Sequence, residues 1–177
     1  MRVISGLYKG RILEGFNIEG TRPTMDRVKE SMFAMIQNYI KDSTCLDLFA
    51  GSGALGIEAI SNGASITYFV DNSKEVEKVL KKNLKGINNY EILITDYHKA
   101  LKSFIANNIK FDLIILDPPY DAHYINKILD IIYDNNLLNK DGIILCEYET
   151  EKIKTNKFHI LKMRKYGSKI VTIFDIE

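Results

Sequence analysis

The sequence has few cysteines and no long apolar run, and both absences narrow the class of protein. Cys45 and Cys146 lie inside apolar segments, where a small buried side chain is the usual interpretation, so neither a disulfide nor a cysteine metal site is expected. No segment approaches the ~18 apolar residues that a membrane span requires. The first residues also lack an apolar core of signal-peptide length. We therefore expect a soluble, cytoplasmic protein that folds as one domain, residues 1–177.

The three histidines lack the spacing of metal ligands, so we expect no metal site. Net charge is +1, but it is unevenly distributed. Lys and Arg exceed Asp and Glu in residues 1–30 and 150–177, whereas residues 31–149 carry eleven basic against sixteen acidic residues. This pattern would suit a polyanion at the rim and a cationic ligand at the centre, and a solvated surface would explain it equally well.

From about residue 40 onward, short apolar segments rich in β-branched residues alternate with helical patterns. Such alternation predicts βαβ units around a mainly parallel sheet. The last two segments, FHILKMRK and KIVTIFDI, are separated only by YGS and predict an antiparallel hairpin. With them, the seven expected strands include STCLDLFA, SITYFVD, YEILITD, FDLIILD and GIILCEY. The predicted fold is therefore α/β, with a seven-stranded, mostly parallel sheet and an antiparallel C-terminal hairpin.

The first forty residues precede this sheet. RVISG and GRILEGF predict a small β-hairpin, and residues 24–40 predict a helix with Thr24 as its N-cap. Helical periodicity predicts a buried face of five residues, namely Met25, Val28, Met32, Met35 and Tyr39. The opposite, polar face would carry Arg27, Lys29 and Glu30.

The first predicted strand leads into a glycine-rich loop, DLFAGSGALG, with the spacing G-x-G-x-x-G. In dinucleotide sites such glycines bring the backbone and a helix N-terminus against a pyrophosphate. Here Asp47 stands four residues before Gly51, and a carboxylate in that place would repel a pyrophosphate. The loop instead favours a cation. S-adenosylmethionine carries a sulfonium and an ammonium group and no phosphate, so it is the predicted cofactor.

Three successive strands end in a carboxylate, at Asp47, Asp71 and Asp96. The carboxyl ends of parallel strands are where open α/β sheets bind ligands. We predict that Asp47 faces the ammonium group, that Asp71 accepts hydrogen bonds from the ribose hydroxyls and that Asp96 accepts from the adenine amino group. Gly51 and Gly53 would let the backbone approach the ligand. The alternative for each aspartate is that it only caps the following helix.

Two of the three prolines are adjacent, in FDLIILDPPY. Consecutive prolines cannot continue a central strand, so the chain must leave the sheet as a stiff loop. The Asp117 side chain and the Pro118 carbonyl could then hold one amino group with its lone pair towards an activated methyl group. Tyr120 would stack on the base, which must be unpaired or flipped. The prediction is amine methylation by Asp117, Pro118, Pro119 and Tyr120, and the alternative is a rigid strand exit with an exposed tyrosine.

Basic residues cluster in two segments. LKKNLK is best interpreted as the exposed face of a helix. KMRKYGSK, residues 162–169, interleaves Tyr166 with basic residues at a predicted hairpin tip, so it is the better candidate for contact with RNA.

LDLFAGSGALGIEA together with LDPPY resembles the Rossmann-type S-adenosylmethionine-dependent methyltransferases that act on exocyclic amines. The strings GTRPTMDRVKESMF and RVISGLYKGRIL narrow the resemblance to the bacterial small-subunit ribosomal RNA guanine-N2 methyltransferases of the RsmD type. EYETEK and the closing hairpin are also similar to that family, so the resemblance covers essentially the whole chain. It implies a guanine of 16S ribosomal RNA, in assembled or partly assembled 30S subunits, as the substrate.

The resemblance also implies roles for individual residues. Cofactor binding falls on seven positions: Asp47, Gly51, Ser52, Gly53, Asp71, Asp96 and Thr24. Catalysis falls on Asp117, Pro118, Pro119 and Tyr120, and Arg22 and Arg27 would contact RNA, for which a surface salt bridge with Asp26 or Glu30 is the alternative. Base stacking by Tyr120 and the place of Lys165 near the hairpin tip add these two residues to the predicted RNA contacts. One departure from the family pattern is that Asp71-Asn72-Ser73 stands where a Glu is expected, which shortens the reach towards the ribose. We expect a monomer.

Three other functions remain open at this point. A DNA adenine-N6 methyltransferase would use the same DPPY residues, but such enzymes usually need additional segments that recognise the DNA sequence, and 177 residues leave little room for them. A non-catalytic RNA-binding assembly factor could keep the fold, although the intact DPPY string argues against it. A dinucleotide oxidoreductase is disfavoured by Asp47.

Overall fold

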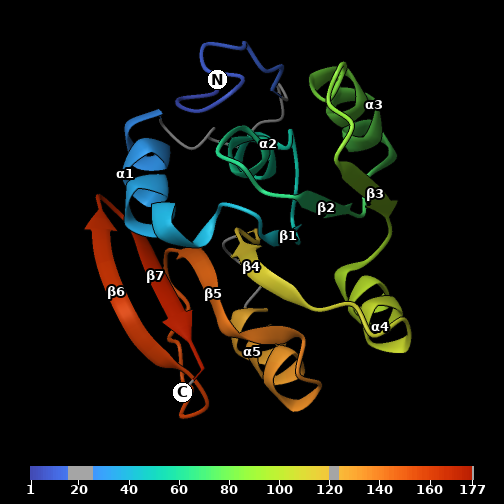
Figure 1. Ribbon diagram of the computed structural model, residues 1–177. Coiled ribbons are helices and arrows are strands. Elements are labelled where there is room, and N and C mark those ends of the chain that lie inside the picture. Colours follow the sequence, from blue (N-terminus) through green and yellow to red (C-terminus); the bar gives the residue numbers. More distant parts are fainter. Residues whose placement is uncertain (16–25, 120–123, 177) are drawn as a thin grey trace.

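The computed structural model describes residues 1–15, 26–119 and 124–176. Seven strands form one sheet in the order β3-β2-β1-β4-β5-β7-β6 (Figure 1). Strands β1 to β5 pair in parallel, and β7 is antiparallel to both β5 and β6. The strands are β1 Thr44–Asp47, β2 Ile66–Asp71, β3 Tyr90–Ile94, β4 Phe111–Leu116, β5 Leu138–Tyr148, β6 His159–Tyr166 and β7 Lys169–Asp175. The predicted sheet and its C-terminal hairpin are confirmed.

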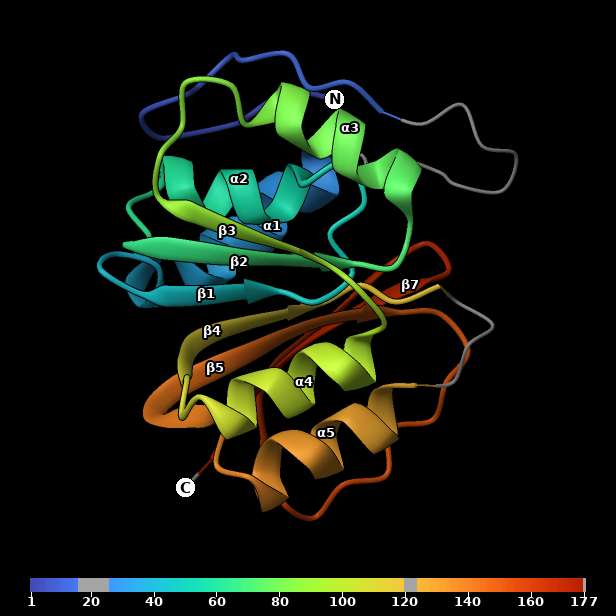
Figure 2. The same ribbon diagram turned by 90° about the vertical axis from the view of Figure 1, so that its right-hand side faces the viewer.

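Helices cover both faces of the sheet (Figures 1 and 2). One face carries α1 (Asp26–Ile36), α2 (Ala54–Ser61) and α3 (Lys74–Asn83), and the other carries α4 (Tyr97–Ala106) and α5 (Ile125–Asp134). The central strands β1, β4 and β5 therefore bury side chains in both directions, which explains why they are largely apolar. Within the described residues, no helix is long and apolar enough to cross a bilayer.

The structure confirms part of the buried face that was predicted for α1. Val28, Met32 and Met35 are buried against the sheet, whereas Thr24 and Met25 lie outside the described residues. Tyr39 was predicted to be buried, but it is 38% exposed. The helix ends at Ile36 and continues as a 3₁₀ turn, Gln37–Tyr39, and this tighter winding takes Tyr39 off the apolar stripe.

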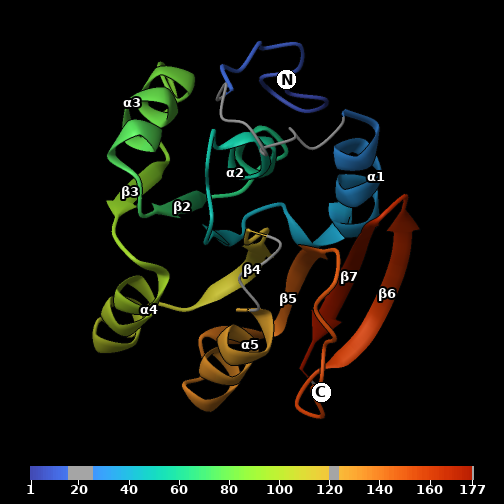
Figure 3. The ribbon, with the colours of Figure 1, turned by 180° about the vertical axis from the view of Figure 1, so that it is seen from behind.

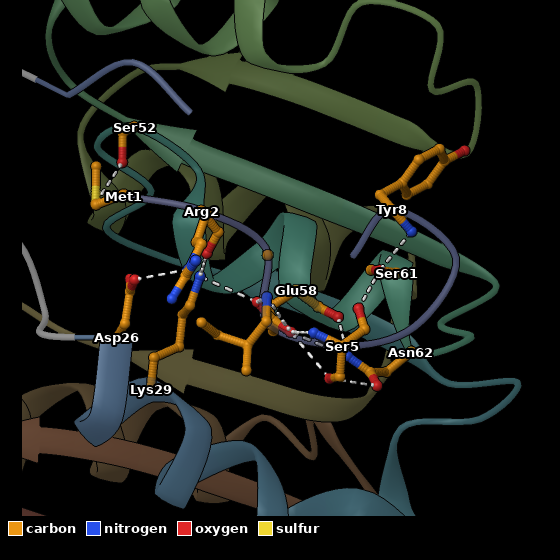
Figure 4. Close-up of polar contacts among 12 residues, drawn as sticks. Met1, Arg2, Ser5, Tyr8, Asp26, Lys29, Ser52, Glu58, Ser61 and Asn62 are labelled. Atoms are coloured by element: carbon orange, nitrogen blue, oxygen red, sulfur yellow. Dashed lines mark hydrogen bonds and ion pairs between the residues drawn. The ribbon is translucent and has the colours of Figure 1, made fainter. Parts of the chain in front are cut away.

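The prediction for Lys29 was also wrong, because this lysine is buried rather than solvated. Its side chain is 2% exposed, and its Nζ lies 3.0 Å from Glu58 Oε2 of α2. Glu58 is itself fully buried. Figure 4 shows both side chains meeting beneath the first residues of the chain. Burial of a lysine requires such a partner, so α1 and α2 are joined here by an ion pair.

The first fifteen residues pack on the outer side of α2 (Figure 1). The predicted hairpin is reduced to a single antiparallel bridge, Arg2 to Ile12. The Glu58 carboxylate holds this segment, since it accepts hydrogen bonds from the backbone N–H of Ile4 at 2.9 Å and of Ser5 at 2.9 Å. Lys29 Nζ donates to the Arg2 carbonyl. The segment is therefore anchored through backbone groups rather than through an extended strand pair.

Candidate active site

The glycine loop connects β1 to α2 at the carboxyl edge of the sheet. Gly51 and Gly53 have left-handed φ values of +50° and +78°, which side chains strongly disfavour. A Cβ on Gly53 would lie 2.4 Å from Leu80 Cδ1, and one on Gly56 would lie 2.3 Å from Phe69 Cε1. At Gly51, a Cβ would meet none of the described residues within 4 Å. The loop is therefore packed tightly against α3 and β2 at Gly53 and Gly56, and it is open at Gly51.

Two of the predicted aspartates hold the backbone of this loop. Asp47 Oδ2 accepts from the Gly56 N–H at 2.9 Å, and Asp71 Oδ2 accepts from the Gly51 N–H at 3.0 Å. The N-cap of α2 is Gly53, which has no side chain, so Asp47 serves as the cap in its place. In a dinucleotide site these amides would face a pyrophosphate. Because carboxylates already occupy them, the geometry argues against that class of ligand.

Asp96 and Ser52 have structural contacts of their own. Asp96 is the N-cap of α4, and its Oδ1 accepts from the His98 N–H at 2.8 Å. The capping role that the sequence left open for this aspartate is therefore present. Ser52 is buried, with its Oγ 3.9 Å from Met1 Sδ and its carbonyl accepting from Asn83 Nδ2 at 2.9 Å.

A row of charged side chains crosses the carboxyl edge of the sheet. The register pairs Asp47 of β1 with Ile115 of β4, and Leu116 with Cys146 of β5, so Asp117 follows beside Glu147. Two residues before each of these three acids lies a residue of the core packed on α1, namely Cys45, Ile115 and Leu145. Since strand side chains alternate in direction, the three acids point to that same face.

Lys169 completes this row from β7. Its Nζ forms an ion pair with Glu147 Oε1, with side-chain exposures of 15% and 0% respectively. Sequence reasoning assigned neither residue a role. The sequence does contain a signal for the burial of Glu147. Side chains alternate in direction along a strand, so in GIILCEY Glu147 points the same way as Leu145, which is buried.

The electrostatics of this row follow from its burial. Burial raises the pKa of Asp47 to about 7, against the lowering effect of the Gly56 N–H and with a further rise from Asp71. Burial likewise raises the pKa of Asp117 to about 8, to which Glu147 adds, while Lys169 lowers it and Asp47 raises it. Clustered carboxylates with raised pKa values are stabilised in their ionised form by a cation. The site therefore favours a positively charged ligand.

S-adenosylmethionine fits this set of hydrogen-bond acceptors. Its ammonium group and ribose hydroxyls require acceptors, which the carboxylates at the strand ends provide. A carboxylate has about four acceptor positions, and the hydrogen bonds from Gly51 and Ser73 to Asp71 use two of them. Asp71 thus keeps acceptor capacity for a ribose while its orientation is fixed by the loop.

The remaining predicted residues are placed less completely. Pro118 is buried and Pro119 exposed, directly after β4. Arg27 is exposed on α1, and Lys165 is exposed on β6. Arg22, Thr24 and Tyr120 lie outside the described residues. Among those that are described, no group of three or more His, Cys, Asp and Glu could hold a metal ion.

A glycine loop braced by carboxylates, followed by an Asp-Pro-Pro strand exit on the same edge, defines a class of protein. The class is that of the Rossmann-like, S-adenosylmethionine-dependent methyltransferases. Within it, the chain belongs to the family described as Conserved hypothetical protein 95, whose model matches residues 1–175.

Individual relatives agree with this assignment. A Haemophilus influenzae protein named Ribosomal RNA small subunit methyltransferase D is 37% identical over 172 residues, covering 94% of this chain and 89% of the relative. The Escherichia coli K12 protein of the same name is 32% identical over 151 residues, covering 85% and 76%.

Solved structures give the same fold. The structure of the Escherichia coli protein yhhF has a TM-score of 0.85 at 30% identity, covering 100% of this chain and 98% of that one. A Thermus thermophilus protein has a TM-score of 0.85 at 22% identity, covering 99% of each chain, which shows the fold alone.

Proposed function

We propose that this protein transfers the methyl group of S-adenosylmethionine to the exocyclic N2 amine of a guanine in 16S ribosomal RNA, within assembled or assembling 30S subunits. The observation that carries the proposal is the position of Asp117, beside Asp47 and the glycine loop on one face of the sheet. The names of the relatives support small-subunit ribosomal RNA as the substrate. We further propose that the chain acts as a monomer and a single domain.

In this proposal the chain's main task is to position two reactants. The bound cofactor supplies a methyl group that its sulfonium makes electrophilic. Asp71 and the glycine loop orient the cofactor, while the Asp117 carboxylate and the Pro118 carbonyl accept hydrogen bonds from the target amine. These two acceptors direct the nitrogen lone pair along the line of transfer, and such alignment supplies much of the rate enhancement. Tyr120 stacks on the guanine ring.

The methylated nitrogen must then lose one proton. Asp117 already contacts that nitrogen in the proposed geometry, and its raised pKa makes the carboxylate a strong proton acceptor once the positive charge of the bound cofactor favours its ionised form. The ionised Asp117 carboxylate is thus both the acceptor that orients the amine and the group that takes its proton.

The proposal is tested by transfer of labelled methyl groups to unmethylated 30S subunits, naked 16S RNA and DNA, followed by nucleoside mass spectrometry. We expect N2-methylguanosine from the ribosomal material alone. Methyladenine in DNA would instead establish the DNA alternative, and absence of transfer to every substrate would favour the assembly-factor alternative. The ratio of 30S to naked RNA would identify the assembly stage that is recognised.

A variant tests the role of Asp117 directly. Asp117→Ala is expected to abolish methyl transfer while S-adenosylmethionine still binds, as measured by calorimetry. Asp141→Ala is the matched control, because Asp141 is exposed on β5 away from the carboxyl edge. Full activity of Asp117→Ala would refute the mechanism. Activity should also survive a chelator, and a strict metal requirement would contradict the proposed chemistry.

A further inference from the structure

Strand β6 is the outermost strand at one edge of the sheet (Figures 1 and 3). Residues 159–165 are all exposed, and only Tyr166 is half-buried. The sequence of the strand, HILKMRKY, contains three Lys or Arg residues and one His, with no Asp or Glu. The charged side chains of this exposed edge strand are therefore all basic.

The basic side chains of β6 follow the ladder with β7. Lys162 pairs with Ile173 and Arg164 with Val171, and both partners belong to the core on the α1 face. Lys162 and Arg164 thus lie on that face, about 7 Å apart along the strand. Lys165, opposite Ile170, lies on the other face. Positive charge consequently runs along the edge on both sides.

This edge is continuous with the candidate active site. Tyr166 pairs with Lys169, the lysine that holds Glu147 beside Asp117. The Tyr166 hydroxyl also contacts Ser31 Oγ of α1. Arg27 lies one helical turn before Ser31, on the same side of α1. The positively charged strip is therefore linked through Tyr166 and Lys169 to the strands that carry the candidate site, with β5 and β7 between it and Asp117.

We propose that this strip, formed by Lys162, Arg164, Lys165 and Arg27, binds the phosphate backbone of the RNA that flanks the target base. The inference rests on the proposed function, because it assigns a second contact surface to the same substrate. Contacts to phosphates fix register and orientation without reading sequence. The strip would hold a large RNA while the base enters the site at Asp117.

A second copy of the chain is the other occupant to consider, because Ile160, Leu161 and Met163 are exposed on the same strand. Pairing of two β6 edges would bring their lysines and arginines close to one another, and like charges across a strand pair are destabilising. Lysine on an edge strand is itself a device against such pairing. Charge complementarity therefore favours RNA.

The test compares two double variants with the same change in charge. Lys162→Glu/Arg164→Glu reverses the strip, and Lys102→Glu/Lys110→Glu is the control, because these lysines are exposed on α4 and just before β4. Binding to 30S subunits and to 16S RNA is measured between 50 and 200 mM salt, roughly the range in which phosphate contacts dominate affinity. Methyl transfer is measured in parallel.

We expect the strip variant to bind RNA at least tenfold more weakly and to raise KM for the RNA with little change in kcat. The plot of log K against log salt has a negative slope, and its magnitude should decrease by about 1.4 to 1.8. Two phosphate contacts are lost, and each contributes about 0.7 to 0.9 to that magnitude. The control should stay within twofold of wild type. Thermal unfolding checks the fold of both variants, and Lys162→Gln/Arg164→Gln replaces the reversal if the latter unfolds.

Equal RNA binding by the strip variant and the control would overturn the inference, and dimer formation by the strip variant in sedimentation would identify pairing of copies as the property that these charges control. If wild type transfers no methyl group but the reversal still weakens RNA binding, the proposed function fails and the strip stands. If wild type neither binds RNA nor transfers methyl groups, both fail.

Discussion

Two lysine–glutamate pairs join different elements of this molecule, and they differ in what surrounds them. Lys29 and Glu58 lie between α1, α2 and the first residues of the chain (Figure 4). Glu58 also accepts hydrogen bonds from the backbone of Ile4 and Ser5. Lys169 and Glu147 lie at the carboxyl edge of the sheet, where Glu147 raises the pKa of the neighbouring Asp117 and Lys169 lowers it.

The difference separates a structural ion pair from one that tunes a reacting group. Around Glu58, backbone donors and Lys29 together satisfy the buried carboxylate, so its charge serves to anchor a segment. At Glu147, the pair lies next to a second carboxylate, that of Asp117, and so influences the charge state of that group. The same two residue types thus contribute to stability in one place and to reactivity in the other.

The largest effect on stability is expected from Lys29→Met. This change leaves the Glu58 carboxylate buried without its cation, which typically costs about 3 to 5 kcal/mol. Urea unfolding should show that loss in the free energy of unfolding, whereas Lys110→Met, at an exposed site, should change it by less than about 0.5 kcal/mol. Equal values for the two variants would mean that the anchor is not held by charge.

Next in size is the effect of Lys169→Met on the pH dependence of transfer. Because Lys169 lowers the pKa of Asp117, its removal should move the rising limb of kcat to higher pH. Lys169→Arg should restore the wild-type midpoint. A lower melting temperature with an unchanged midpoint would show that the second pair is structural like the first.

A third effect is expected in the stability of the cofactor-free protein. The folded-state pKa values of Asp47 and Asp117, about 7 and about 8, lie above the ordinary value of 3.8. The native state therefore binds more protons than the unfolded state between these limits, and stability falls as pH rises towards 8. Melting temperatures from pH 5.5 to 8.5 should decline, and Asp117→Asn should flatten the upper part of the decline. A rise over this range would contradict the assigned direction.

The smallest effect concerns cofactor affinity. A bound cation stabilises ionised Asp47 and Asp117, so S-adenosylmethionine should bind a few-fold more tightly at pH 8 than at pH 6. Calorimetry in two buffers of different ionisation enthalpy should detect proton release at pH 7. Asp117→Asn provides the control, because it removes one of the two titrating groups and should reduce the number of protons released. Binding that is independent of pH would indicate that the row does not sense the cofactor's charge.

Much of the fold was predictable because its signals are local. Strand segments, the glycine loop and the aspartates at strand ends are all encoded within a few residues of where they act. The burial of Lys29 was not predictable from the sequence, because its partner Glu58 is distant in sequence. The pattern within α1 alone groups Lys29 with the polar residues. Burial of a charge depends on tertiary context, which periodicity does not record.

The candidate site was predictable to a similar degree. The sequence indicated that Asp47, Asp71 and the glycine loop would share one edge of the sheet, since parallel strands bring their carboxyl ends together. It did not indicate that Gly56 and Gly51 would donate to these carboxylates, or that Lys169 would complete the row. Lys169 enters through an antiparallel strand, and the position of β7 between β5 and β6 is a long-range pairing that no local pattern specifies.

That position has a consequence for biosynthesis. During translation the chain emerges from its N-terminus at about 5 to 20 residues per second, and β7 is the last strand to appear. β5 can pair with β4 as soon as it is made, whereas β6 pairs only with β7 among the described strands and must wait for it. The lysine beside Asp117 arrives with β7. A nascent chain can thus assemble the glycine loop early, while the charge balance of its reacting edge is set only once β7 has been made.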